Sequence, residues 1–224
     1  MDKKKIFIAV DTNKISKAKK IIKDTQSNKI KLGYKFGLEF FYSKNGRKFI
    51  SSLKKQTIFL DLKLNDIPNT VRSAMRSLKN LNISYLTVHL SSGLSALKAL
   101  KKESKNIRIA GVTTLTSLNN KDLKEIGYSK KVNELVVHQA KLAKKANLDA
   151  IICSGHEIKS VRKVFNKEII TPGIKMYNTK NDQKRIMSPN DAFAIGSNWL
   201  VIGRSITKGN IKKNIKNLLE ILEV

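Results

Sequence analysis

Short apolar runs alternate with amphipathic stretches along the chain, and this alternation constrains the fold more than any other feature of the sequence. Many of the runs contain β-branched side chains, which is typical of buried strands. Eight such runs occupy Ile6 to Val10, Lys29 to Leu32, Thr57 to Leu60, Tyr85 to Val88, Arg108 to Val112, Ala150 to Ile152, Ile169 to Thr171 and Leu200 to Ile202. Helix-like segments occupy Ser16 to Thr25, Asn69 to Leu81, Leu94 to Glu103, Lys131 to Ala146, Glu157 to Val164 and Ile211 to Leu222.

Eight strand and helix repeats predict an α/β fold, a closed (β/α)8 or TIM barrel, formed by residues 1–224 as a single domain. The length of 224 residues suits this fold. Such barrels reach ~200–250 residues as one unit. No linker rich in proline, glycine or serine divides the chain. An open doubly wound sheet is the alternative, but no Gly-x-Gly-x-x-Gly turn follows the first run.

The sequence gives no indication of membrane insertion or export. Its apolar runs are far shorter than the ~20 residues of a membrane span. The apolar run that follows the basic N-terminus ends at Asp11, too early for a secretory signal. Cys153 is the single cysteine, so an internal disulfide is impossible, and we interpret it as a core residue. We therefore expect a cytoplasmic protein with no membrane partner.

The formal net charge of +28 is the most unusual feature of the composition. Such a charge is typical of nucleic-acid-binding proteins, and that function is one alternative. However, the lysines are scattered over the outer faces of the predicted helices, and no recognition motif or aromatic stacking platform accompanies them. We therefore predict no nucleic-acid partner, and expect the charge to attract anionic substrates.

Polar residues follow almost every apolar run, at the position where a barrel carries its active site. In a (β/α)8 barrel this site lies at the C-terminal ends of the strands. The residues at these ends are Asp11, Lys31, Asp61, Lys63, His89, Thr113 to Ser117, Ser154, Gly155, Pro172 to Ile174 and Gly203 to Ser205. Each could be an ordinary cap or turn residue, but their joint placement at one end predicts a polar site.

The segment from Asp61 to Thr70 places two carboxylates and an ammonium within six residues. Side chains alternate along a strand, so Asp61 and Lys63 are predicted to point to the same face. Asp66 is predicted to cap the next helix, with Pro68 in its first turn. A single Asp-x-Lys pair is often only a structural ion pair.

This segment resembles the signature of the orotidine 5′-phosphate decarboxylase family, Asp-x-Lys-x-x-Asp-Ile-Pro-x-Thr, at every specified position. A related group of magnesium-dependent phosphosugar synthases and decarboxylases shares the Asp-x-Lys-x-x-Asp core, and remains an alternative. The Ile-Pro-x-Thr continuation, residues 67–70, favours the decarboxylase.

The resemblance extends over nearly the whole chain. Further matching segments are Val10-Asp11, Lys31-Leu32-Gly33, Val112 to Ser117, Thr171 to Ile174, Asp182 to Arg185 and Ile202 to Ser205. Lys175 is a departure, because many bacterial members have arginine after Thr-Pro-Gly-Ile. Lysine keeps the positive charge but lacks the planar fork of arginine.

The resemblance implies decarboxylation of orotidine 5′-phosphate to UMP in de novo pyrimidine synthesis, with neither a cofactor nor a metal ion. It implies a catalytic network of alternating charge formed by Lys31, Asp61, Lys63 and Asp66, in which Lys63 donates the proton to C6. It also implies a homodimer in which Asp66, Ile67 and Thr70 act across the subunit interface.

The resemblance also implies the substrate contacts. Asp11 and Lys31 are expected to bind the ribose, Thr116 the pyrimidine, and Gln183 both phosphate and base from the loop at 173–187. Gly203 and Arg204 follow the last strand, where barrels commonly bind phosphate. The complete set of expected substrate-binding residues is Asp11, Lys31, Ile67, Thr70, Thr116, Pro172, Lys175, Gln183, Gly203 and Arg204. His89 is interpreted as structural or peripheral.

Overall fold

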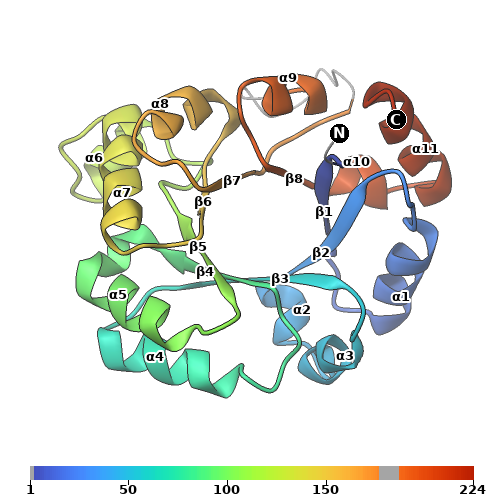
Figure 1. Cartoon of the computed structure of the whole chain (residues 1–224), viewed down its shortest axis with the longest axis horizontal. Helices are drawn as coiled ribbons and strands as arrows, with labels where there is room; N and C mark the ends of the chain where they lie inside the picture. The colour runs from blue at the N-terminus through green and yellow to red at the C-terminus, as the bar shows by residue number, and fades with distance from the viewer. Residues whose placement is uncertain (1–2, 177–186) are drawn as a thin grey trace.

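The chain folds into a closed barrel of eight parallel strands, as predicted. The computed structural model describes residues 3–176 and 187–224. Neighbouring strands pair in sequence order and β8 pairs with β1 to close the barrel, with helices around the outside (Figure 1). The strands are β1 (Lys5–Ala9), β2 (Lys31–Gly37), β3 (Thr57–Leu64), β4 (Tyr85–His89), β5 (Arg108–Val112), β6 (Ala150–Ile152), β7 (Glu168–Thr171) and β8 (Trp199–Ile202).

The six predicted helical segments are all present, with ends that differ by a few residues. They are α1 (Ile15–Asp24), α4 (Pro68–Ser77), α5 (Gly93–Glu103), α7 (Val132–Lys145), α8 (Ile158–Arg162) and α11 (Ile211–Ile221). Five short helices were not predicted, because elements of this length show little periodicity: α2 (Leu38–Phe41), α3 (Gly46–Ser52), α6 (Asn120–Glu125), α9 (Pro189–Ala194) and α10 (Arg204–Thr207). Two 3₁₀ turns, η1 (Leu90–Ser92) and η2 (Gly155–Glu157), complete the described elements. Within the described ranges, no helix combines the length and apolar character needed to cross a bilayer.

Alternation along the strands produces two separate cores. Side chains on the outer face of the sheet pack against the helices, as Ile6, Leu60 and Val88 do. Side chains on the inner face fill the barrel with aromatic rings, and Phe7 stacks on Trp199 with ring centroids 4.0 Å apart. Towards the C-terminal end of the barrel, Ala9, Phe59 and Val201 of this inner cluster border a cavity that charged side chains also line.

Strand β2 differs most from its predicted boundaries. The sequence predicted a strand from Lys29 to Leu32, whereas β2 runs from Lys31 to Gly37. Gly33 lies inside the strand. A Cβ at this position would meet the ring of Phe7 at 2.5 Å. Glycine is required here by packing inside the barrel and not by a turn.

The N-terminal end of the barrel is closed by hydrogen bonds around one carboxylate. Glu168 accepts a hydrogen bond from the Tyr85 hydroxyl at 2.6 Å and from Arg108 Nη1 at 3.1 Å. Lys5 Nζ lies 3.6 Å from the same carboxylate. Burial raises the pKa of Tyr85 well above its usual value, and the neighbouring Glu168 carboxylate raises it further.

Candidate active site

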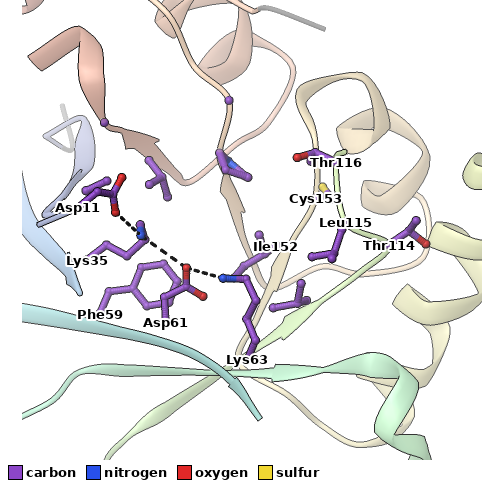
Figure 2. Close-up of a pocket in the computed structure, with 16 residues that line it drawn as sticks. Asp11, Lys35, Phe59, Asp61, Lys63, Thr114, Leu115, Thr116, Ile152 and Cys153 are labelled. Carbon is purple, nitrogen blue, oxygen red and sulfur yellow. Dashed lines mark hydrogen bonds and ion pairs between the residues drawn. The ribbon is translucent and has the colours of Figure 1, made fainter. Parts of the chain in front are cut away.

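Four charged side chains converge at the C-terminal ends of the first three strands. Asp11, Lys35, Asp61 and Lys63 all line a cavity of about 320 Å³ at this end of the barrel. Figure 2 shows the four side chains in one row along the wall of the cavity. The predicted convergence of strand-end residues is therefore present for Asp11, Asp61 and Lys63.

The four residues form a chain of alternating charge. Lys35 Nζ lies 3.3 Å from Asp11 Oδ1 and 3.6 Å from Asp61 Oδ2. Lys63 Nζ donates to the same Asp61 Oδ2 at 2.9 Å. Asp61 is the more buried of the two carboxylates, with 11% of its side chain exposed against 60% for Asp11. A carboxylate with so little exposure is stabilised by its two ammonium partners.

The local sequence of β3 explains why Asp61 and Lys63 reach the cavity together. Both side chains face the interior of the barrel, and Leu62 between them packs into the outer core. Lys63 has a φ of 50°, in the left-handed region that residues other than glycine rarely adopt. Such a conformation costs about 1–3 kcal/mol and is frequent at active sites.

Lys31 was expected in this network, and this placement was wrong. Lys31 is the first residue of β2, and its Nζ lies 6.0 Å from the ring of Trp199, towards the opposite end of the barrel. Lys35, four residues later on the same face, takes the expected place. The alternation of Leu32, Tyr34 and Phe36 with smaller or charged residues is the sequence signal for the longer strand.

The expected substrate-binding residues divide into two groups. Thr116, Pro172 and Gly203 line the cavity, together with Asp11. Among the described residues, Lys175 and Arg204 do not line it: Lys175 is half-buried beside Met187, and Arg204 is exposed at the start of α10. Gln183 lies outside the residues that the structure describes.

Asp66, Ile67 and Thr70 lie on the outside of the chain. All three are exposed, and none is among the described residues that line the cavity. Asp66 Oδ1 accepts a hydrogen bond from the backbone N–H of Ile67 at 2.7 Å. The N-cap of α4 is Ile67 and not Asp66, without a side-chain cap, so the predicted capping role of Asp66 was wrong.

Thr114 was named from the sequence only as a strand-end residue, and its partner Gln139 was not singled out. Thr114 lines the cavity, and its backbone N–H and its hydroxyl both donate to Gln139 Oε1 of α7, at 2.8 and 3.2 Å. A helix residue that fixes a strand end by tertiary contact leaves no local pattern in the sequence. Cys153 is buried in the core, as predicted, and burial raises the pKa of its thiol.

His89, at the end of β4, is half-buried beside the charged network. Burial lowers the pKa of His89, the Lys63 ammonium lowers it further, and Asp61 acts in the opposite direction. The imidazolium of His89 therefore loses its proton more readily than that of an exposed histidine. This agrees with its interpretation as a structural or peripheral residue.

The arrangement can stabilise negative charge that develops inside the cavity. Lys63 keeps 34% of its side chain exposed, while its ammonium is held by a carboxylate that is itself enclosed. An ammonium fixed in this way can interact with an anionic centre and can donate a proton to it.

Comparison with known proteins identifies the family. A family model described as orotidine 5'-phosphate decarboxylase / HUMPS family matches residues 4–215. The orotidine 5'-phosphate decarboxylase of Wolbachia pipientis subsp. Culex pipiens is 40% identical over 212 residues, which cover 92% of each chain. That of Bacillus mycoides is 45% identical over 188 residues, which cover 78% of this chain and 79% of the relative.

A solved structure of a protein with the same name as these relatives has a similar fold. The crystal structure of orotidine 5'-phosphate decarboxylase from Lactobacillus acidophilus is 28% identical, with a TM-score of 0.85 and coverage of 100% of both chains. The fold and the matched sequence agree, including the signature segment that runs from the end of β3 into α4. The chain therefore belongs to the orotidine 5'-phosphate decarboxylase / HUMPS family.

Proposed function

We propose that this protein decarboxylates orotidine 5′-phosphate to UMP in de novo pyrimidine synthesis. The observation that carries this proposal is the Lys63 ammonium, held 2.9 Å from Asp61 at the wall of the cavity. The Ile-Pro-x-Thr continuation of the signature supports the same activity, as do the two orotidine 5'-phosphate decarboxylases that are 40% and 45% identical to this chain.

In the proposed reaction, Lys63 acts as the proton donor. The bond between C6 and the carboxylate breaks, carbon dioxide leaves, and the electron pair remains on C6. The Lys63 ammonium stabilises this charge and transfers one proton to C6, which yields UMP and a neutral amine that water reprotonates. Asp61 lies beside the substrate carboxylate and holds Lys63 in position. Neither a metal ion nor an organic cofactor takes part in these steps.

The remaining residues of the cavity bind the substrate in this proposal. Asp11 and Lys35 bind the ribose hydroxyls, with Lys35 in the role first expected for Lys31. Thr116 contacts the pyrimidine, and Pro172 lines the same pocket.

The phosphate is bound at the end of β8 and by the segment that follows β7. Gly203 brings the main chain close to the ligand, and the Arg204 guanidinium supplies charge-assisted hydrogen bonds. Lys175 and Gln183 contribute from the segment after β7. The scattered surface lysines attract this anionic substrate, and their effect decreases as salt is added.

We also propose that the active protein is a cytoplasmic homodimer. Asp66 and Thr70 are exposed in the single chain, and 66% of the surface of Ile67 is accessible, an unusual exposure for a large apolar residue. In the dimer, Asp66 would complete the charged network of the partner, and Ile67 and Thr70 would contact the partner's substrate. An active monomer by light scattering would contradict this arrangement.

A magnesium-dependent phosphosugar lyase or decarboxylase is the second candidate, because that group shares the Asp-x-Lys-x-x-Asp core present here at Asp61, Lys63 and Asp66. The test is the loss of orotidine 5′-phosphate absorbance with purified protein in EDTA. Rapid turnover that EDTA does not reduce supports the metal-free decarboxylase. Turnover of phosphosugars that requires magnesium, without turnover of orotidine 5′-phosphate, would establish the second candidate.

A further inference from the structure

The pairing of β3 with β4 is irregular at the active site. Leu60 pairs with Leu86 and Leu64 pairs with Val88, with a register shift between the two pairs. The three residues Asp61 to Lys63 therefore lie opposite a single residue of β4, which is Thr87. A bulge of this kind interrupts the hydrogen bonds of the ladder and redirects side chains.

The hydroxyl of Thr87 bridges the two ends of this bulge. Thr87 Oγ1 accepts a hydrogen bond from the backbone N–H of Lys63 at 2.6 Å, and lies 3.2 Å from Asp61 Oδ1, to which it donates. Thr87 is fully buried, with 0% relative exposure. Within the barrel, its hydroxyl satisfies a backbone donor that the bulge leaves without a regular ladder position.

The chemistry of the hydroxyl fixes the direction of both hydrogen bonds. The backbone N–H of Lys63 can only donate, so the Thr87 oxygen accepts there. The single hydroxyl hydrogen is then directed at Asp61 Oδ1, because an ionised carboxylate only accepts. Asp61 Oδ2 remains for the ammonium groups of Lys35 and Lys63. The two oxygens of Asp61 therefore have different partners, and the carboxylate cannot rotate without losing them.

We propose that Thr87 is a positioning residue for the reaction. Its hydroxyl holds Lys63 in the left-handed conformation and sets the rotation of the Asp61 carboxylate. The Lys63 ammonium therefore stays at the cavity wall, where Figure 2 shows it beside Asp61. Thr87 is not among the described residues that line the cavity, so it acts through Asp61 and Lys63 and not by contact with substrate. The inference rests on the proposed function of the site.

The test compares Thr87→Val, which removes the hydroxyl at nearly constant volume, with Thr87→Ser, which keeps it. Thr25→Val is the matched control, because Thr25 is also fully buried and its hydroxyl donates to Ile21 O at 2.7 Å, remote from the cavity. The measurements are kcat and KM for orotidine 5′-phosphate, the affinity for UMP, and the melting temperature.

We expect Thr87→Val to lower kcat by ~100-fold, because a displacement of about 1 Å in a reacting group has an effect of this size. KM and UMP affinity should change little, since the contacts with bound ligand remain. Thr87→Ser should restore most of kcat, and Thr25→Val should lower the melting temperature without lowering kcat. Equal kcat in Thr87→Val and wild type, at temperatures where both are folded, would overturn the proposal.

A second variant and a crystal structure separate the role of Thr87 from a failure of Thr87→Val to fold. Thr87→Cys, with a weak donor in the same position, replaces Thr87→Val if the latter does not fold, and should give an intermediate loss of kcat. A crystal structure of the variant tests the geometry without turnover: Lys63 should leave the left-handed region, and an unchanged Lys63 would overturn the proposal. If wild type itself does not convert orotidine 5′-phosphate, the proposed function fails, while this structural arm still decides the role of Thr87.

Discussion

The two ends of the barrel contain similar groups in different arrangements. At the N-terminal end, the Glu168 carboxylate contacts Arg108 and Lys5 and accepts the Tyr85 hydroxyl over an inner layer of aromatic rings. At the C-terminal end, the Asp61 carboxylate contacts two lysines beside a cavity. The first arrangement closes the barrel, and the second leaves an ammonium accessible to a ligand.

This difference shows that a carboxylate with cationic neighbours is not by itself a sign of catalysis. The direction of the strands and the presence of a cavity decide what the same groups can do. Lys31 and Lys35 make the point most simply, because they lie on the same face of one strand and four residues apart. Lys31 approaches Trp199 towards the N-terminal end of the barrel, and Lys35 forms ion pairs with Asp11 and Asp61.

Among the substitutions that compare the two ends of the barrel, Lys35→Ala should have the largest effect. We expect Lys35→Ala to lower kcat/KM by ~100-fold or more, since it removes a cation between two carboxylates in the binding cavity. Lys31→Ala is the matched control and should leave kcat/KM within a few-fold of wild type. Steady-state kinetics with orotidine 5′-phosphate measures both. A larger loss in Lys31→Ala would reverse the assignment of the two ends.

The closing network at the N-terminal end should matter for stability and not for turnover. Glu168→Ala leaves the enclosed Tyr85 hydroxyl without its carboxylate partner, and we expect the free energy of unfolding to decrease by about 1–3 kcal/mol. Urea denaturation measures this change. Glu103→Ala, which removes a carboxylate paired with Arg76 at the helix surface, should cost less. A large loss of kcat in folded Glu168→Ala would contradict the separation of the two ends.

The glycine inside β2 should be required for packing. Gly33→Ala places a Cβ at 2.5 Å from the Phe7 ring, and overpacking of this kind costs about 1–3 kcal/mol. Gly37→Ala is the control, because its Cβ would lie 3.7 Å from the nearest neighbouring atom, Lys35 Nζ, an ordinary van der Waals distance. Thermal denaturation of both variants distinguishes these outcomes, and equal melting temperatures would show that β2 tolerates a side chain at position 33.

The smallest expected effect is a pH dependence of stability that arises from His89. Its pKa in the folded state lies below the ordinary value of 6.5, first because of burial and then because of the Lys63 ammonium. The unfolded chain therefore binds more protons as the pH falls, and the free energy of unfolding decreases below about pH 6.5.

Substitution of His89 tests this dependence. His89→Gln should weaken the decrease in unfolding free energy on acidification, as followed by urea denaturation at several pH values. His138→Gln, on the exposed face of α7, is the control and should leave the decrease unchanged. An identical pH dependence in wild type and His89→Gln would contradict the assignment.

The barrel and much of the site could be predicted from the sequence, because both depend on local patterns. Alternating apolar runs indicated the strands, and the spacing of Asp61 and Lys63 placed both on one face. Lys35 was missed because the predicted strand ended at Leu32, and the Phe7 ring that requires a glycine at position 33 lies on a neighbouring strand. Thr87 was missed for a similar reason, since a bulge depends on the register of two strands and not on the sequence of one.

The most direct test of the account is the decarboxylation of orotidine 5′-phosphate by wild type and Lys63→Ala, measured side by side in EDTA with UMP binding as the control. We expect rapid turnover by wild type and a loss of ~1,000-fold or more in Lys63→Ala, within the range of general acid catalysis, with UMP still bound. Near-normal turnover by Lys63→Ala would remove Lys63 from the role of proton donor, and no turnover by wild type would contradict the proposed activity.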